Sequence, residues 1–133
     1  MARTLLDSSV LVGAIRDPFG PGAEQLRRSK AADLCTSVVV AGELRFGAAK
    51  TAKPRQAIET VDALLAVLKV EPLAPPIDEV YGRLRARREA QGLRMSANDL
   101  WIAAHAMALE CALGTADRDF EGIPGLRVER WPR

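Results

Sequence analysis

The sequence has one histidine and two cysteines among its 133 residues, and no long hydrophobic run. Its longest apolar stretches, 38–41 and 63–68, are far shorter than the roughly 20 residues that a membrane-spanning helix needs. Asp7 interrupts the N-terminal apolar run before a signal-peptide core could form. We therefore expect a cytoplasmic protein without a membrane segment.

The scarcity of cysteine and histidine also limits the chemistry of the chain. Cys35 and Cys111 lie among apolar neighbours and share no metal-ligand spacing, which predicts reduced core cysteines. His105 follows Asp99 by six residues, about 240° further around a helix, so we expect a structural or surface role for it. No hydrolytic triad can be assembled from this histidine.

Length and charge describe an ordinary globular chain with a basic bias. The 133 residues fit one domain, 1–133, with a sizeable core. Fifteen of the nineteen basic residues are arginine, which suits bidentate phosphate contacts. If four of the seventeen acids form one site, nineteen basic residues face thirteen acids elsewhere. A basic protein surface around an acidic site suits an enzyme that acts on a polyanion, but it equally suits a protein that binds an acidic protein.

Short apolar strands alternate with amphipathic helices along the whole chain. We predict strands at 4–6, 34–36, 70–73, 112–115 and 126–129, and helical patterns at 10–15, 23–30, 38–50, 54–68, 77–91 and 97–111. This alternation indicates an α/β fold with three layers and a central, mostly parallel sheet. The order of the strands does not follow from the sequence.

Asp7 stands where the first strand turns into the first helix. A carboxylate at the carboxyl end of a strand lies at the edge where open α/β sheets bind ligands. The alternative is a helix cap, since Asp and Ser are favoured at that position. Asp117 and Asp119 follow the strand 112–115 in the same way, with an Asx turn as their alternative.

Two further acids lie on helices. Glu43 has only apolar residues or glycine three and four positions away, so it lies beside the apolar stripe without a partner in its own helix. Its alternative is an acid that reaches solvent from the edge of the stripe. Asp99 shares a face with Ile102, Ala103 and Ala106, although Ser96 and Asp99 also form a capping box.

The hypothesis that these acids converge carries an electrostatic consequence. Each pair of carboxylates about 5 Å apart would repel by roughly 3 kcal/mol at an effective dielectric near 20. Several such pairs exceed what a marginally stable domain tolerates without bound cations or raised pKa values. Oxygen ligands without histidine or cysteine favour Mg²⁺, with Mn²⁺ as an alternative, over Zn²⁺.

Four segments in fixed order carry a resemblance to a known family. They are LLDSSVLV, AGELRFG, NDLWIAAHA and LGTADRDFEGIPGLRVERW, which together span nearly the whole chain. With them the chain resembles a PIN domain, and specifically the VapC toxins of type II toxin–antitoxin systems. The motif acids here are Asp7, Glu43, Asp99 and Asp117.

The resemblance implies a metal-dependent endoribonuclease. The four acids would hold one or two Mg²⁺ ions, with Asp119 as a possible helper and with supporting hydroxyls from Ser8, Ser9 and Thr115. Water activated by the metal would attack the phosphodiester, needing no 2′-hydroxyl and leaving a 5′-phosphate. The family also implies an antitoxin partner of the VapB kind, whose C-terminal segment usually occupies the groove, and a homodimer.

Several other residues have two interpretations. Arg83, Arg85, Arg87 and Arg88 form either a solvated helix face or an RNA-backbone footprint, with Arg85 and Arg88 as substrate-binding candidates. Arg45 could contact substrate or antitoxin. We interpret four aromatic residues as packing residues rather than base-stacking platforms: Phe46, Trp101, Phe120 and Trp131.

Two rival functions remain open at this point. The first is a non-catalytic PIN-like module that binds RNA or protein, against which the complete set of acids argues. The second is another Mg²⁺-dependent phosphate hydrolase, such as a phosphatase with an N-terminal Asp nucleophile. Such enzymes commonly carry a second acid two residues after the first, and here that position is Ser9.

Overall fold

The computed structural model describes residues 3–133 and contains a five-stranded parallel sheet in the order β3-β2-β1-β4-β5. The strands are β1 (Thr4–Leu6), β2 (Leu34–Ser37), β3 (Lys69–Glu71), β4 (Ala112–Thr115) and β5 (Val128–Arg130). The predicted strand positions are confirmed, with β3 starting and ending earlier than expected and β5 starting later. Sequence alone could not supply the strand order.

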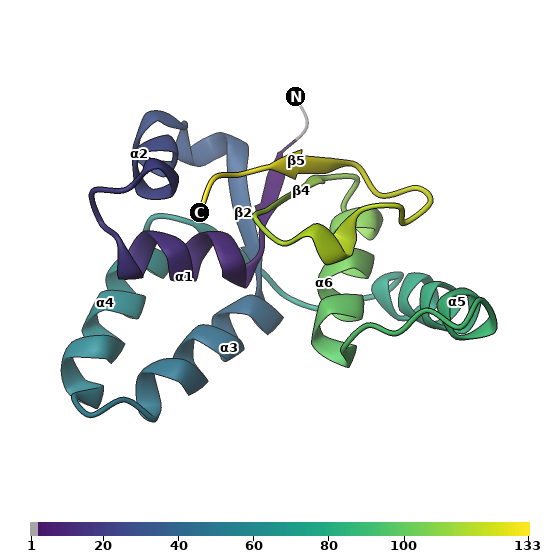
Figure 1. Cartoon of the computed structure of the whole chain (residues 1–133), viewed down its shortest axis with the longest axis horizontal. Helices are drawn as coiled ribbons and strands as arrows, with labels where there is room; N and C mark the ends of the chain where they lie inside the picture. Colours follow the sequence, from purple (N-terminus) through teal and green to yellow (C-terminus); the bar gives the residue numbers. More distant parts are fainter. Residues whose placement is uncertain (1–2) are drawn as a thin grey trace.

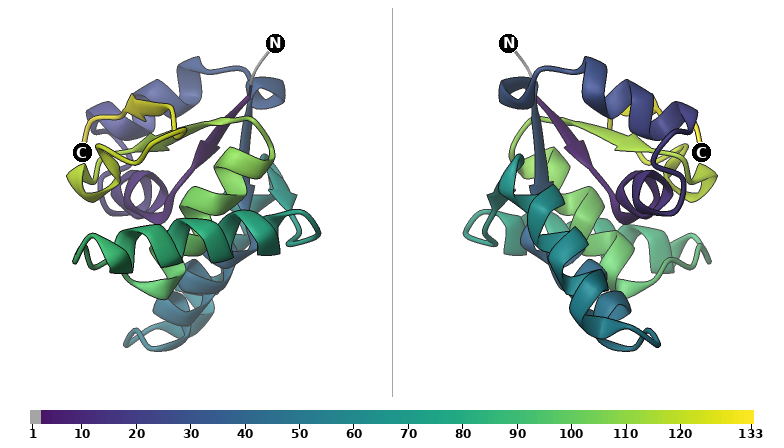
Figure 2. Two further views of the ribbon diagram at one scale, coloured as in Figure 1. Left: turned by 90° about the vertical axis from the view of Figure 1, so that its right-hand side faces the viewer. Right: turned by 90° about the vertical axis from the view of Figure 1, so that its left-hand side faces the viewer.

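Six helices flank this sheet and make the expected three layers (Figure 1). They are α1 (Ser8–Arg16), α2 (Pro21–Arg28), α3 (Val38–Ala49), α4 (Pro54–Ala66), α5 (Ile77–Ala90) and α6 (Ala97–Ala108), with short 3-10 turns η1 (Ala31–Asp33) and η2 (Arg118–Phe120). In Figure 1, α1 to α4 lie to the left of the central strands, and α5 and α6 lie to the right. In the side views, α5 is nearest the viewer from one side, and α1, α2 and α4 are nearest from the other (Figure 2).

The local sequence explains where several helices begin and end. Ser37 accepts a hydrogen bond from the backbone of Val39, and Pro54 opens α4 at a position where its missing N–H costs nothing. Gly92, just beyond α5, has the positive φ of 73° that glycine adopts most readily at a helix end. Within residues 3–133, no helix is long and apolar enough to cross a membrane.

The core lies on both faces of β1 and β4. Leu5, Leu6 and Leu113 are fully buried, as are Ile102 and Ala103 on α6. Both cysteines are buried and unpaired, which confirms their predicted place in the core. At Gly114 a Cβ atom would come within 2.9 Å of Thr4 and Leu6 side chains, so only glycine fits between the packed chains there.

The strand order places a switch point beside β1. β1 pairs with β2 on one side and with β4 on the other, and the chain reaches β4 only after crossing over from β3. In open parallel sheets, the crevice at such a point lies beyond the carboxyl ends of the strands and is where ligands bind. Asp7 follows β1 there, and Asp117 follows β4.

Candidate functional site

Asp7 is held in one orientation by three hydrogen bonds. Its Oδ1 accepts from the backbone N–H of Val10 at 3.1 Å and from Ser9 Oγ at 2.7 Å, while its Oδ2 accepts from Thr115 Oγ1. The bond to Val10 makes Asp7 the N-cap of α1. The capping interpretation is therefore confirmed, and the carboxylate also contacts β4. Only 3% of the residue is exposed.

The environment of Asp7 raises the pKa of its carboxyl group. Burial is the largest cause, the hydrogen bonds from Thr115, Ser9 and Val10 oppose it, and the negative charge of Asp117 adds to it. A buried carboxylate with an acidic neighbour is a group that a cation would stabilise. This electrostatic setting distinguishes Asp7 from a simple helix cap.

Two hydroxyl groups connect the ends of β1 and β4. Thr115 Oγ1 accepts a hydrogen bond from the backbone N–H of Asp117 at 2.9 Å while donating to Asp7. Ser9 Oγ accepts from the backbone N–H of Ala116 at 3.0 Å while donating to Asp7. These contacts fix the loop after β4 against the start of α1. Both hydroxyls therefore contact the Asp7 carboxylate directly.

Glu43 enters the same region from α3. Its Oε1 accepts from Ser8 Oγ at 2.8 Å, and its Oε2 accepts from Asn98 Nδ2 at 3.4 Å. Ser8 and Asn98 thus connect α3 to α1 and α6. Sequence reasoning missed Asn98, although it directly precedes Asp99 in the NDLWIAAHA segment.

Asp99 lies in the first turn of α6, where its backbone N–H donates to Ser96 Oγ at 3.1 Å. This contact confirms the Ser96 cap. Burial, together with the charges of Glu43, Asp117 and Asp7, raises the pKa of the Asp99 carboxyl to about 6 against the opposing Ser96 hydrogen bond. The structure therefore brings Glu43, Asp117 and Asp7 within electrostatic reach of Asp99.

Asp117 and Asp119 differ in their positions. Asp117 is partly buried, and its Oδ1 accepts from the backbone N–H of Asp119 at 2.9 Å, which caps η2. The expected Asx-type turn is thus present. The Asp119 residue is exposed. Of the two, Asp117 is the acid whose charge acts on Asp7 and Asp99.

The donor set of this acidic site fits a hard divalent cation. The acids Asp7, Glu43, Asp99 and Asp117 offer only carboxylate oxygens, which Mg²⁺ and Mn²⁺ prefer. In the described part of the chain, no three His, Cys, Asp or Glu side chains are already placed as ligands of one ion. The charges of Glu43, Asp117 and Asp7 act on Asp99, and hydrogen bonds to the carboxylates hold Asp7, Glu43 and Asp117. The chemistry of this donor set therefore fits a divalent cation.

The predicted substrate-binding arginines lie outside the acidic site. Arg45 on α3 forms an ion pair with Asp62 on α4 at 2.7 Å. Arg85 on α5 pairs with Glu89 at 2.8 Å and donates to the hydroxyl of Tyr81. Both ion pairs are exposed, so neither is a strong constraint on its arginine.

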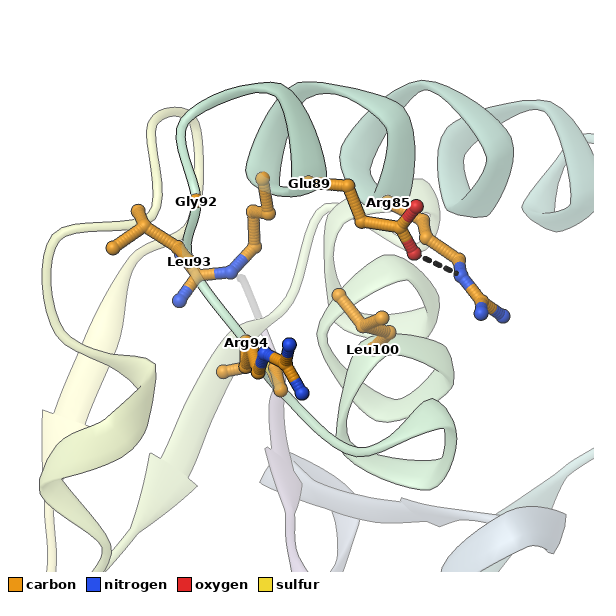
Figure 3. A pocket seen from close by; sticks show the side chains of 8 residues that line it. Arg85, Glu89, Gly92, Leu93, Arg94 and Leu100 are labelled. Carbon is orange, nitrogen blue, oxygen red and sulfur yellow. Dashed lines mark hydrogen bonds and ion pairs between the residues drawn. The ribbon is translucent and has the colours of Figure 1, made fainter.

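Arg88 lines a pocket between the end of α5 and the start of α6, with a volume of about 520 Å³. Figure 3 shows Arg94 on the connecting loop below α5 with Leu100 of α6 beside it, while the side chain of Leu93 points away from both. Leu100, which follows Asp99 in α6, is the residue of that helix that lines this basic pocket. Arg94 also lines this pocket, and its sequence context had not indicated a binding role.

His105 is fully buried and lies away from the acids. Its Nδ1 is 2.8 Å from Ser37 Oγ, and burial lowers the pKa of its imidazole. Of the two expected roles, the structure therefore supports the structural one, because a side chain without solvent contact cannot act on a bound polymer.

One of the four aromatic predictions is wrong. Phe120 and Trp131 are almost fully buried, and Trp101 stacks on Tyr81 with ring centroids 3.7 Å apart, as packing residues should. Phe46 is instead 65% exposed. It lies on the solvent side of α3, where the periodicity of a mostly apolar helix did not distinguish the buried face from the exposed one.

The fold and the acidic site together define a PIN-like α/β protein. The model of the PIN domain family matches residues 4–126, so the chain belongs to that family. It is similar to the ribonuclease VapC2 of Rickettsia felis, with 32% identity over 97% of this chain and 98% of that protein. The ribonuclease VapC4 of Mycobacterium tuberculosis is 32% identical over 95% of each chain.

A solved structure gives the same result. The crystal structure of VapBC2 from Rickettsia felis, bound to a DNA fragment from its promoter, aligns with a TM-score of 0.90 and 30% identity over 97% of this chain and 98% of that one. The VapC resemblance and the PIN-like α/β fold expected from the four motifs are confirmed. The chain is a nuclease of the hydrolase class.

Proposed function

We propose that this protein is the toxin of a type II toxin–antitoxin pair and cleaves RNA as a Mg²⁺-dependent endoribonuclease. Membership of the PIN family and similarity to VapC ribonucleases support the reaction class. One observation on this chain carries the proposal furthest: Asp7 is buried, is held by three hydrogen bonds, and lies close enough to Asp117 for that negative charge to raise its pKa.

Asp7 and Asp99 are the principal metal ligands in this proposal, with Glu43 and Asp117 completing the set. PIN-domain nucleases depend on divalent metal ions, and all-oxygen ligands select Mg²⁺, with Mn²⁺ as a substitute. When bound, the ion supplies Lewis-acid chemistry: it orients the scissile phosphate, lowers the pKa of the attacking water and stabilises charge on the leaving oxygen.

The remaining residues of the site position these ligands. Ser9 and Thr115 fix the plane of the Asp7 carboxylate, so that its direction does not depend on the substrate. Ser8 and Asn98 hold Glu43 on the opposite side. Asp119 is exposed beside Asp117, where it can assist at the edge of the site.

Substrate and partner contacts follow from the surface. We assign Arg45, Arg85 and Arg88 to the RNA backbone, since guanidinium groups bind phosphate without reading sequence. Arg45 and Arg85 are exposed, and Arg88 is partly buried. The Rickettsia relative was solved as a VapBC complex, which supports a VapB-like antitoxin as partner here. The proposal includes a homodimer and a cytoplasmic location.

A labelled structured RNA, incubated with Mg²⁺ or with EDTA, tests the function. We expect cleavage in Mg²⁺, no cleavage in EDTA, and no cleavage by Asp7→Asn in either. RNA binding without cleavage would favour a non-catalytic module instead. Release of inorganic phosphate from phosphomonoesters would favour a phosphatase, although Ser9 stands where such enzymes carry a second acid.

A further inference from the structure

An aromatic ring lies exposed on the same face of α3 as the acidic site. Glu43, Phe46 and Lys50 are spaced three and four residues apart, so they follow one face of the helix. Phe46 is 65% exposed, which is unusual for a phenylalanine on a helix whose other side enters the core. The ring is therefore available to a partner molecule.

A groove joins this ring to the acidic site. The groove has a volume of about 650 Å³, and its lining includes Glu43 and Asn98 as well as Phe46 and Lys50. Because Glu43 and Asn98 are hydrogen-bonded to each other, the groove begins at residues that already belong to the site. A polymer that reaches the acids can continue along it.

The shape and charge of the groove suit one nucleotide. Gly42 and Gly47 also line it, and a Cβ atom added at either would meet nothing within 4 Å, so the space beside the ring is open. The Nζ of Lys50 lies 4.8 Å from the centroid of the Phe46 ring. An ammonium group next to an aromatic face offers a phosphate contact and a stacking surface together.

We propose that Phe46 stacks on the base of an RNA nucleotide adjacent to the scissile phosphate, and that Lys50 contacts the phosphate of that nucleotide. This inference rests on the proposed ribonuclease function and assigns a substrate subsite to it. Stacking tolerates any base, because every base has a π-face, so the subsite adds affinity and position rather than a strict sequence requirement. The other occupants of such a face would be an antitoxin segment or a second copy of this chain.

RNA is favoured over these occupants by charge and by continuity. A protein surface that buried Phe46 would also have to bury the ammonium group of Lys50 beside it, which is costly without an acidic partner. A phosphodiester supplies that negative charge. The groove also begins at Glu43, one of the four acids proposed as metal ligands.

Steady-state cleavage of a labelled RNA in Mg²⁺ by Phe46→Ala, Phe46→Leu and Phe46→Trp tests the subsite. We expect a KM about 5- to 100-fold higher for the Ala and Leu variants, the range that loss of one stacked base produces, with kcat changed much less. Phe46→Trp should retain a KM close to that of the unchanged protein. Phe19→Ala is the matched control, because Phe19 is 93% exposed and lies outside the groove lining.

An abasic nucleotide next to the cleavage site gives the second measurement. If stacking occurs, the abasic substitution should weaken binding to the unchanged protein but hardly further weaken binding to Phe46→Ala, because both remove the same contact. Fully additive losses would overturn the proposal. So would a normal KM for Phe46→Leu, which would indicate a simple apolar contact.

Size-exclusion chromatography with light scattering separates the rival occupants. Dissociation of an oligomer by Phe46→Ala, with a normal KM per active site, would overturn the subsite and assign the face to a second copy. Loss of antitoxin binding with a normal KM would assign it to the antitoxin. If the unchanged protein cleaves RNA but the Phe46 variants behave normally, only the subsite fails; if the unchanged protein cleaves no RNA, the function and the subsite both fail.

Discussion

Thr115 and Asp7 connect the ends of two neighbouring parallel strands. The Thr115 hydroxyl donates to Asp7 Oδ2 and at the same time accepts from the backbone N–H of Asp117 at 2.9 Å. One hydroxyl therefore sets the direction of the principal acid and the course of the loop that carries another. Positioning groups of this kind affect metal affinity and rate nearly as strongly as the ligands do.

Replacing Thr115 by Val tests this relationship, because Val has a similar shape but no hydroxyl. We expect cleavage to fall about 10- to 100-fold, partly recovered at higher Mg²⁺, since the carboxylate is no longer held for the ion. Thr115→Ser keeps the hydroxyl and should retain most of the activity. A Thr115→Val variant with an unchanged rate at low and high Mg²⁺ would contradict the role of this contact.

The raised pKa of Asp99 predicts a pH dependence of stability in the metal-free protein. The carboxyl has a pKa of about 6 in the folded protein, above the ordinary value of 3.8 that it has in an unfolded chain. The folded state therefore binds the proton more tightly. The resulting stabilisation is fully present below pH 3.8 and is lost as the pH rises through 6.

Urea denaturation in EDTA, compared between the unchanged protein and Asp99→Asn, measures this contribution. The free energy of unfolding of the unchanged protein, relative to that of the variant, should fall as the pH rises from about 4 to about 7. Burial of His105 lowers the pKa of its imidazole and acts in the opposite direction, but both proteins share it. A difference that is constant or grows with pH would refute the assignment.

His105 should matter for stability and not for catalysis. Replacement by Gln removes the contact between Nδ1 and Ser37 Oγ, which leaves Ser37 only its hydrogen bond from the Val39 N–H, and loss of a buried hydrogen bond costs about 1–3 kcal/mol. We expect a lower midpoint in urea but the same dependence of kcat on pH. Loss of one limb of the pH–rate profile, with stability unchanged, would show instead that the imidazole transfers a proton.

The chemistry of the products distinguishes hydrolysis by water from attack by the ribose. Water activated at the acidic site would leave a 5′-phosphate and a 3′-hydroxyl, and a 2′-deoxy substitution at the cleavage position would still allow cutting. Enzymatic ligation and phosphatase treatment of the fragments identify these ends. A 2′,3′-cyclic phosphate would rule out the proposed mechanism.

The fold and the four acids were accessible from the sequence because each leaves a local signal. Strand–helix alternation and turn residues give the α/β class, and acids directly after strands stand out from apolar surroundings, as Asp7 and Asp117 do. Strand order depends on contacts distant in sequence, so no local pattern contains it. The confirmed cap at Ser96 was also purely local.

Three residues were misassigned or missed because their positions depend on tertiary contacts that leave no local signal in the sequence. Phe46 was assigned to packing because α3 is apolar on more than one side, and only the packing of α3 against α4 and α6 shows which side remains exposed. The contact between Asn98 and Glu43 joins two residues that lie on different helices and are 55 positions apart in the sequence. Arg94 lies on a loop, where no periodicity indicates a direction.

The Asp7→Asn variant tests the central claim most directly. Asn keeps the shape of the side chain and can still cap α1. It removes a buried carboxyl group whose pKa is raised by burial. We expect no RNA cleavage in Mg²⁺ and a melting temperature equal to or above that of the unchanged protein. Cleavage at the unchanged rate in excess Mg²⁺ would contradict the assignment of Asp7 as a catalytic metal ligand.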